Sequence, residues 1–227
     1  MNWPAIWLSL RLASIVCLVL LAIGVPIAYW IAFSRWRWKF LVEAVVALPL
    51  VLPPTVLGYY MLVALGPRSP LGRLAEALFS TRLAFSFTGL VIASVLYSLP
   101  FAVQPMVNAF ESVDRKLLHA AAVLGASRSR AFATIILPIA KAGVVTGAVL
   151  SFAHTIGEFG VVLMVGGNIP GITQTISIAI YDEVQALDYA LAARTSALLL
   201  GFSFAALILV YALNRRSSIW WSSPHNA

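Results

Sequence analysis

The residues with the clearest chemical potential are His154 and Glu158, a histidine and a carboxylate four positions apart. This spacing places both side chains on one face of a helix, where they could supply two ligands of a metal ion. A third ligand is not evident, because His119 and His225 lie in distant parts of the sequence and the chain has a single cysteine. That single cysteine also excludes a disulfide framework. We therefore expect no metal site and interpret His154 as a histidine satisfied by ordinary contacts.

A phosphate-binding loop is also missing from the sequence. The pattern of glycine, four residues and then Gly-Lys-Ser/Thr does not occur, and neither does the dipeptide Gly-Lys. Such a loop wraps backbone N–H groups around a nucleotide phosphate. We therefore expect a chain that is not an enzyme and that binds no cofactor itself.

The composition is typical of a membrane protein. Of 227 residues, 61% are apolar and 10% are charged, and the mean hydropathy is +0.94. A soluble domain has about 45–50% apolar and about 25% charged residues. In a soluble protein the net charge of +7 would suggest nucleic acid. The apolar excess instead indicates membrane lipid as the surroundings and no nucleic-acid partner.

Five apolar stretches are long enough to cross a membrane, since a spanning helix needs about 20 residues. They cover residues 8–33, 40–65, 85–110, 136–165 and 193–213. We expect an all-α fold of about five transmembrane helices in a single domain over 8–214, followed by a short cytoplasmic tail, 215–227. The sequence shows no internal repeat.

The distribution of basic residues between the loops predicts the orientation. Lysines and arginines are typical of the cytoplasmic side, and they are more numerous in alternate connections, although one of the opposite connections carries Arg68, Arg73 and Arg82. We therefore expect the N-terminus outside and the C-terminus in the cytoplasm. The basic residues on which this rests are Arg35, Arg37, Lys39, Arg115, Lys116, Arg128, Arg130, Arg215 and Arg216.

The long connection at about 111–135 has the pattern of ordered structure. Asp114 can cap a helix whose apolar residues recur at helical spacing, and Gly125 can end it. Ser127 can cap a second helix that continues into the fourth span. The alternative is an amphipathic helix that lies among the lipid headgroups.

This connection resembles the signature loop of the membrane subunits of ABC importers: Glu-Ala-Ala, three residues, Gly, nine residues, Ile, one residue, Leu-Pro. The spacing matches throughout, but the glutamate position is His119. In that family the loop is the coupling helix, which docks in a cleft of the ATPase subunit. The resemblance implies this role for Leu117, Leu118, His119, Ala120, Ala121, Gly125, Ile135, Leu137 and Pro138.

Further segments resemble the permease subunits of molybdate importers, with sulfate and thiosulfate permeases as close relatives. They are residues 48–60, 154–182 and 213–216, and residues 168–175 favour molybdate. The resemblance implies the type I ABC importer permease fold and a homodimer in the bacterial inner membrane. It also implies a cytoplasmic ABC ATPase dimer that binds ATP and Mg, and a periplasmic or extracellular molybdate-binding protein. The transported anion would be molybdate and also tungstate.

Two groups of intramembrane residues are candidates for the pathway or gate. Pro49, Pro53 and Pro54 must interrupt a helix, and the half-helix that restarts near Thr55 would favour an anion. A merely kinked packing helix is the alternative. Glu158 would repel an anion, so we interpret it as a structural acceptor or gate element. The flanking glycines, Gly157 and Gly160, would allow another backbone to approach closely, as in a subunit contact or a moving gate, and Phe159 belongs to the same candidate segment.

The spans contain no cluster of arginines and lysines to hold an anion. A separate binding protein could therefore supply the selectivity. An ion-coupled secondary carrier would need its own charged site at the membrane centre, and a membrane hydrolase would need His154 and Glu158 for chemistry. We regard both as less favoured alternatives.

Overall fold

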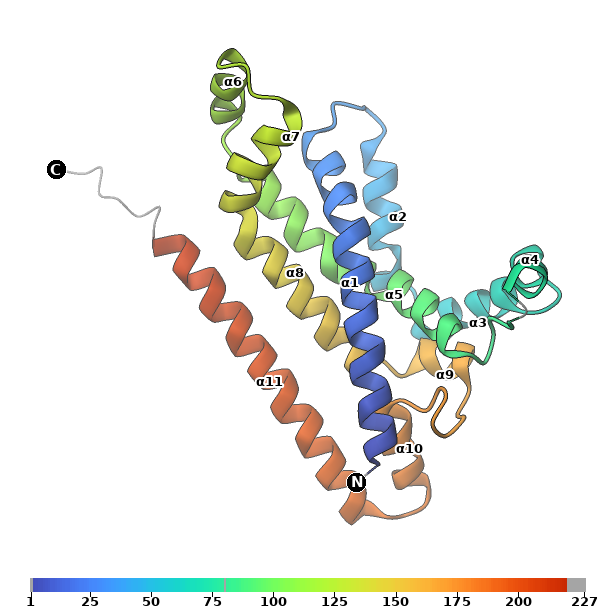
Figure 1. Ribbon diagram of the computed structural model, residues 1–227. Helices are drawn as coiled ribbons and strands as arrows, with labels where there is room; N and C mark the ends of the chain where they lie inside the picture. The colour runs from blue at the N-terminus through green and yellow to red at the C-terminus, as the bar shows by residue number, and fades with distance from the viewer. Residues whose placement is uncertain (1, 80, 220–227) are drawn as a thin grey trace.

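The computed structural model describes residues 2–79 and 81–219, and every regular element within them is helical (Figure 1). The elements are α1 (Trp3–Phe33), α2 (Lys39–Val51), α3 (Pro54–Leu65), α4 (Pro70–Phe79), α5 (Phe87–Glu111), α6 (Arg115–Val123), α7 (Arg128–Ala131), the π-helical turn η1 (Phe132–Ile136), α8 (Leu137–Gly157), α9 (Gly160–Gly166), α10 (Ile176–Gln185) and α11 (Tyr189–Ile219).

Four helices are long and apolar enough to cross a membrane, and a bent pair supplies a fifth candidate span. The four are α1, α5, the continuous stretch Arg128–Gly157 and the Tyr189–Leu213 part of α11. The prediction of an all-α protein with about five spans is confirmed. The expected tail begins within α11, which continues to Ile219, and residues 220–227 lie outside the described residues.

The second expected span, residues 40–65, is not one continuous helix. It breaks after α2, and α3 leaves at an angle of 111°. Leu52 and Pro53 are both extended, with ψ angles of 135° and 136°. A residue that precedes proline avoids the helical region, and the consecutive prolines Pro53 and Pro54 impose this on two positions in a row. Pro49, by contrast, stays inside α2 and is buried.

The fourth expected span, 136–165, was wrong at its far end. Helix α8 stops at Gly157, Glu158 is extended with φ −68° and ψ 137°, and α9 begins separately at Gly160. The segment from Gly157 to Gly160 is short and lies between apolar residues, so the hydropathy pattern continues across it, but its two glycines weaken the helix. The short helices α4 and α10 in the connections were not predicted.

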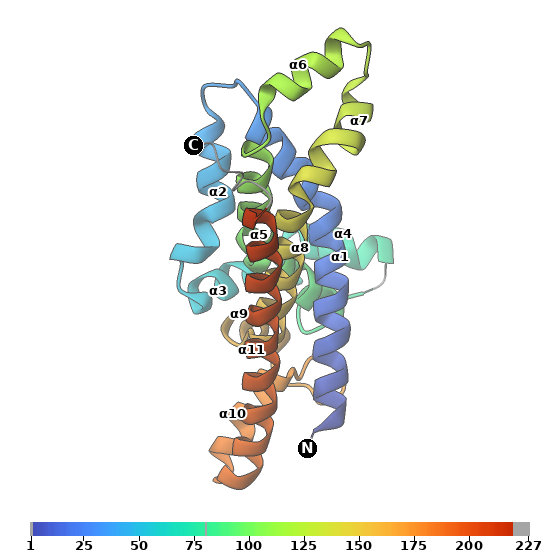
Figure 2. The same ribbon diagram turned by 90° about the vertical axis from the view of Figure 1, so that its left-hand side faces the viewer.

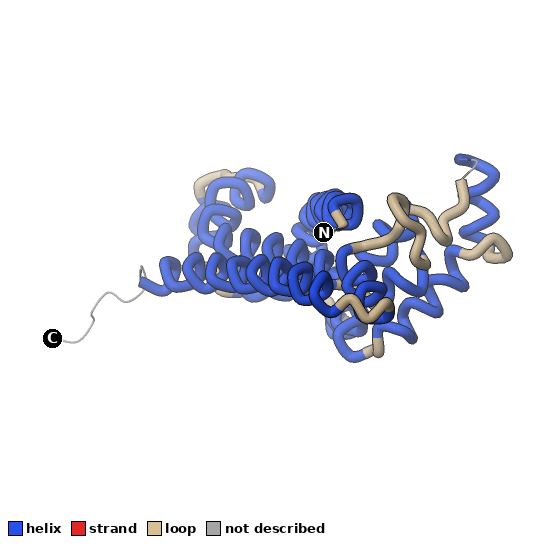
Figure 3. The backbone as a smooth tube through the Cα atoms, turned by 90° about the horizontal axis from the view of Figure 1, so that it is seen from below, coloured by secondary structure: helices blue, strands red, loops and turns tan. Residues whose placement is uncertain are grey.

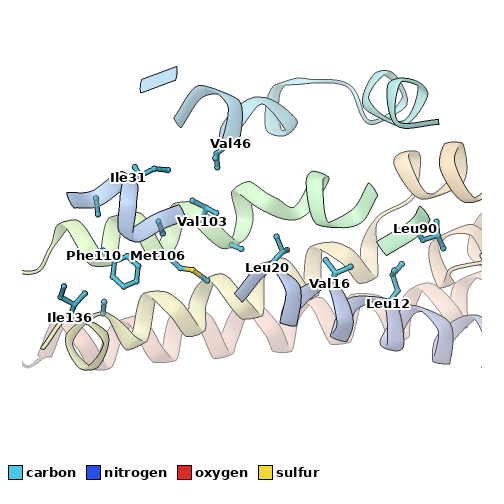
Figure 4. Packing of buried hydrophobic residues seen from close by; sticks show 14 of the residues in the cluster. Leu12, Val16, Leu20, Ile31, Val46, Leu90, Val103, Met106, Phe110 and Ile136 are labelled. Atoms are coloured by element: carbon cyan, nitrogen blue, oxygen red, sulfur yellow. The ribbon is translucent and has the colours of Figure 1, made fainter. Parts of the chain in front are cut away.

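Helices α1, α5 and α8 pack side by side as the core of the bundle (Figure 4). Between α5 and α8 the approach is close because α8 carries small residues there. A Cβ atom on Gly147 would lie 2.5 Å from the carbonyl oxygen of Ala102, and one on Gly143 would collide with Ala109. Small residues at such contacts let helix backbones approach in a membrane, where lipid is as apolar as the side chains.

The two ends of the bundle are formed by different elements. Helix α6 and the connection from α1 to α2 lie at one end, and the first residues of α1 and α11 lie at the other, together with α10 (Figures 1 and 2). Seen from below, α3 and α4 project to one side of the bundle (Figure 3). The candidate site residues therefore fall into two places: α6 at one end, and the breaks beside α3 and α9 toward the other.

Candidate functional site

Helix α6 forms and ends as its sequence dictates. The side chain of Asp114 caps its start by accepting a hydrogen bond from the Lys116 N–H, at 2.8 Å. At its end Gly125 has φ +78°, and the N–H groups of Gly125 and Ala126 donate to the carbonyls of Ala122 and Ala121 at 3.0 and 2.9 Å. This pair of bonds is a Schellman motif, which requires a left-handed residue.

The tip of α6, formed by Val123 and Leu124, is an exposed apolar surface. These side chains are 87% and 88% exposed, and Leu117 is also exposed. The side chains of His119 and Ala120 point outward as well, whereas Ala121 is buried and Leu118 packs against the main core. Most of the residues that the loop motif identified are thus available to another molecule.

The second half of the loop is attached firmly to the bundle. The hydroxyl of Ser127 caps α7 by accepting from the Arg130 N–H at 3.3 Å. The Phe132 ring then contacts the rings of Tyr29 in α1 and Phe110 in α5, with centroids 5.4 and 6.1 Å apart. A movement of α6 would consequently reach α1 and α5 through Phe132.

Helix α8 follows the turn η1 without a gap, which places the last three residues of the loop motif. Ile135 is half-buried in η1, and Leu137 and Pro138 begin α8. Proline has no N–H and crowds the carbonyl four residues before it. The wider π-helical turn directly before Pro138 accommodates this ring.

The start of α3 offers fewer free N–H groups than the sequence suggests. Pro53 and Pro54 have none, and the Val56 N–H donates to the Pro53 carbonyl at 2.9 Å. In this first turn, only the Thr55 N–H forms no hydrogen bond to another of the described residues. Pro53, Pro54 and Thr55 are nevertheless exposed in the single chain. The start of α3 is therefore an exposed break in the helix and not a strong anion-binding site.

Helices α3 and α9 are held together through two glycines. A Cβ atom on Gly160 would lie 2.6 Å from the Cβ of Pro54, and one on Gly58 would lie 2.7 Å from the Cβ of Met164. The structure thus joins the broken second span to the element that follows Glu158. Residues predicted for the pathway from both parts of the sequence, Pro54 and Gly160, therefore lie in close contact.

Glu158 occupies the break between α8 and α9 and is buried, with 4% of its surface exposed. Its Oε2 accepts a hydrogen bond from the hydroxyl of Ser94 in α5 at 3.1 Å. Its Oε1 is buried without a hydrogen-bond partner among the described residues. A Cβ atom on the neighbouring Gly157 would meet nothing within 4 Å, so the break has free space beside it.

His154 lies one turn earlier, in the same interface between α5 and α8. Its Nδ1 is 2.9 Å from the hydroxyl of Ser98, which is also 2.9 Å from the hydroxyl of Thr155. Its ring stacks on Phe101 with centroids 3.9 Å apart. Sequence reasoning missed Ser94 and Ser98, whose only signal is their spacing of four in an apolar helix.

The polar loop 168–175 is occupied by its own hydrogen bonds. The Asn168 side chain donates to Asp182 at 2.7 Å, and Gln174 donates to both Asn168 and Asp182 at 3.0 and 2.9 Å. Gln174 in turn accepts from the side chain of Asn2 at 3.0 Å. These residues therefore tie the start of α1 to α10.

Residues 24–219 match the family model described as "Binding-protein-dependent transport system inner membrane component". The chain belongs to this permease family. It is 51% identical over 211 residues to "Molybdenum transport system permease protein ModB" of Azotobacter vinelandii, covering 93% of each chain. The protein of the same name from Escherichia coli (strain K12) is 41% identical and covers 81% of this chain and 80% of its own.

The fold of the permease also matches solved structures. One is "Crystal structure of bacterial alginate ABC transporter in complex with alginate pentasaccharide-bound periplasmic protein", with a TM-score of 0.72 and 18% identity. The match covers 97% of this chain and 79% of that one. The permease therefore has the architecture of an ABC importer membrane subunit, and the prediction of that fold is confirmed.

Proposed function

We propose that this permease is the membrane subunit of an ATP-driven importer that carries molybdate, and tungstate as well, across a bacterial inner membrane. The observation that carries the proposal is the 51% identity, over 93% of the chain, to a protein named for molybdenum transport. Sulfate and thiosulfate, tetrahedral oxyanions of related size, are the alternative substrates.

ATP hydrolysis in this proposal belongs to a separate ATPase dimer that binds ATP and Mg and docks on α6. The exposed tip Val123 and Leu124 supports the assignment, because an apolar surface outside the membrane indicates a protein partner. The absence of a phosphate-binding loop from the sequence also supports hydrolysis by a separate chain. Closure of the ATPase dimer would move α6, and the contacts of Phe132 would pass that movement to the core.

The basic residues at the α6 end of the bundle indicate how the permease is oriented in the membrane. The loop with Arg35 and Arg37 lies at the same end of the bundle as α6 and α7, which carry further basic residues (Figures 1 and 2). Such residues concentrate on the cytoplasmic side. The N-terminus is then outside and the C-terminus inside, with α6 placed to meet a cytoplasmic ATPase.

A second copy of the permease would complete the pathway. Pro53, Pro54 and Thr55 are exposed in the single chain although they interrupt a span. Non-helical backbone at membrane depth needs cover by protein or by a water-filled cavity, because lipid cannot satisfy it. We therefore place the two-fold axis of a homodimer beside α3 and α9, with Glu158 as a gate element rather than a ligand.

Selectivity would come from a periplasmic or extracellular molybdate-binding protein. Within the described spans no group of arginines and lysines gathers to hold an anion; in α1, for example, Arg11 lies over the Phe87 ring at 4.6 Å. A pathway that has no strong anion-binding site of its own needs a binding protein that delivers the substrate to it.

Transport in vesicles tests the proposal. Permease, ATPase and molybdate-binding protein are reconstituted, and uptake of labelled molybdate and sulfate is measured with and without ATP. We expect molybdate uptake that needs all three components and that excess sulfate does not block. Preferred uptake of sulfate would select the alternative substrate. Uptake without the ATPase, driven by an ion gradient, would indicate a secondary carrier.

A further inference from the structure

Helix α4, Pro70–Phe79, takes no part in the coupling or gate proposals and lies beside the bundle near the start of α5. Its main neighbour in the described chain is α3. It is seen nearly end-on in Figure 1 and crosses the view in Figure 2, whereas α1 runs along the bundle in both. The axis of α4 therefore runs across the bundle rather than along it. Because the candidate span α5 separates α4 from α6 in the chain, the two helices belong to connections on opposite sides of the membrane.

The direction of α4 is fixed by a tight turn. The hydroxyl of Ser69 donates to the carbonyl of Ala64 at 2.6 Å, and it accepts from the Gly72 N–H at 2.8 Å. A Cβ atom on Gly72 would collide with the carbonyl oxygen of Gly66, so the two helices meet at a close backbone contact. The helix is consequently held in its orientation and is not a loose part of a loop.

One side of α4 is an exposed stripe of leucines. Leu71, Leu74 and Leu78 recur at spacings of three and four and are 57%, 56% and 65% exposed. Ala75, next to them, is buried, and the charged residues Arg73 and Glu76 occupy the other side of the helix. At 3.6 residues per turn, the three leucines form one continuous face.

The charges around α4 are predominantly positive. Arg68, Arg73 and Arg82 lie in or beside it, with Glu76 as the acid. The Nε of Arg82 is 3.6 Å from the Oε1 of Glu76. Arg68 and Arg73 form no ion pair within the residues that the structure describes. Unpaired arginines beside an exposed leucine face are typical of helices that lie at a membrane surface.

We propose that α4 is an interfacial helix whose leucines enter the acyl chains of the leaflet opposite α6 and whose Arg68 and Arg73 contact anionic phospholipid headgroups. A ten-residue helix is about 15 Å long. Three leucines on it offer far less area than the roughly 1,200 Å² that a stable protein interface buries. Charge complementarity with anionic headgroups explains the two unpaired arginines, which a second copy of the same cationic helix would repel.

Spin-label accessibility in the assembled transporter tests this placement. Single nitroxides are attached in Leu74→Cys, Leu78→Cys and the matched control Glu76→Cys, each with Cys17→Ala, in vesicles of phosphatidylethanolamine and phosphatidylglycerol. We expect a several-fold higher ratio of oxygen to aqueous nickel-chelate collisions at positions 74 and 78 than at 76. Equal ratios at all three positions would overturn the proposal. Protection from both reagents, with broadening between labels, would show instead that a second copy covers the helix.

The headgroup contact is tested separately with Arg68→Gln/Arg73→Gln added to the Leu78→Cys variant. We expect the label to lie shallower than with both arginines in vesicles that contain phosphatidylglycerol, and at equal depth in pure phosphatidylcholine. Retention of the ATPase on the tagged permease shows that each variant is folded. An equal depth in both lipids, with and without the arginines, would overturn the role of anionic lipid.

Discussion

At the contact between α5 and α8, glycine is needed because another backbone lies against it, whereas at the end of α6 it is needed because the chain itself turns. A Cβ atom on Gly147 would lie 2.5 Å from the Ala102 carbonyl oxygen. One on Gly125 would meet nothing within 4 Å, although φ there is +78°. The first glycine serves packing within the permease, and the second shapes a surface that is still uncovered. Substitutions should separate the two roles.

The largest effect is expected for Gly147→Val. The added side chain must push α8 away from Ala102, and overpacking of this kind costs about 1–3 kcal/mol or more. We expect a lower melting temperature and a low yield of monodisperse protein in detergent. The matched control is Gly201→Val in α11, where nothing lies within 4 Å of the added Cβ. Equal melting temperatures for the two variants would contradict the close contact.

A loss of transport with intact folding is expected for Glu158→Leu. This change leaves the buried Ser94 hydroxyl without its acceptor, at a cost of about 1–3 kcal/mol. Glu158→Gln keeps one acceptor oxygen, so it should retain assembly and much of the molybdate uptake. Equal transport by the two variants in vesicles would show that the side chain at position 158 needs no hydrogen-bond acceptor for transport.

An uncoupled transporter is expected for Gly125→Val. A β-branched residue at φ +78° costs about 1–2 kcal/mol and would unwind the last turn of α6. The measurement is ATP hydrolysis stimulated by the loaded binding protein, compared with Gly125→Asn, which tolerates the left-handed conformation. We expect stimulation to fall in the valine variant and to persist in the asparagine variant. Equal stimulation of ATP hydrolysis in both variants would show that the left-handed turn at Gly125 is not needed for coupling.

The smallest effect is expected for His119→Glu, which restores the usual residue of the loop motif. The side chain is exposed on α6, and surface changes of this type alter stability by about 0.5 kcal/mol or less. Uptake of molybdate should stay close to that of the unchanged permease. A strong loss would show that His119 makes a specific contact with the ATPase.

The sequence predicted those parts of the fold in which hydropathy and capping agree. The expected spans 8–33 and 85–110 end within a few residues of α1 and α5, and Asp114 and Gly125 bound the helix that they indicated. The bend of 111° after α2 was beyond prediction. Two prolines signal a break, but tertiary packing of α3 on α9 sets its direction.

The candidate site was predictable only in part for a similar reason. Glu158 is conspicuous because a carboxylate within an apolar stretch is costly. Its partner Ser94 is not, because small polar residues are common in membrane helices and their own backbone can satisfy them. The pairing depends on how α5 packs against α8, which no local pattern encodes.

The most direct test of the coupling claim is retention of the ATPase on a tagged permease that carries Leu124→Asp. The Leu124 side chain is 88% exposed, so the change should leave the melting temperature of the permease unaltered. We expect the ATPase to be lost during purification and molybdate-dependent ATP hydrolysis in vesicles to fall with it. Full retention of the ATPase together with normal stimulated hydrolysis would contradict docking of α6 on the ATPase and would indicate a helix that lies among lipid headgroups.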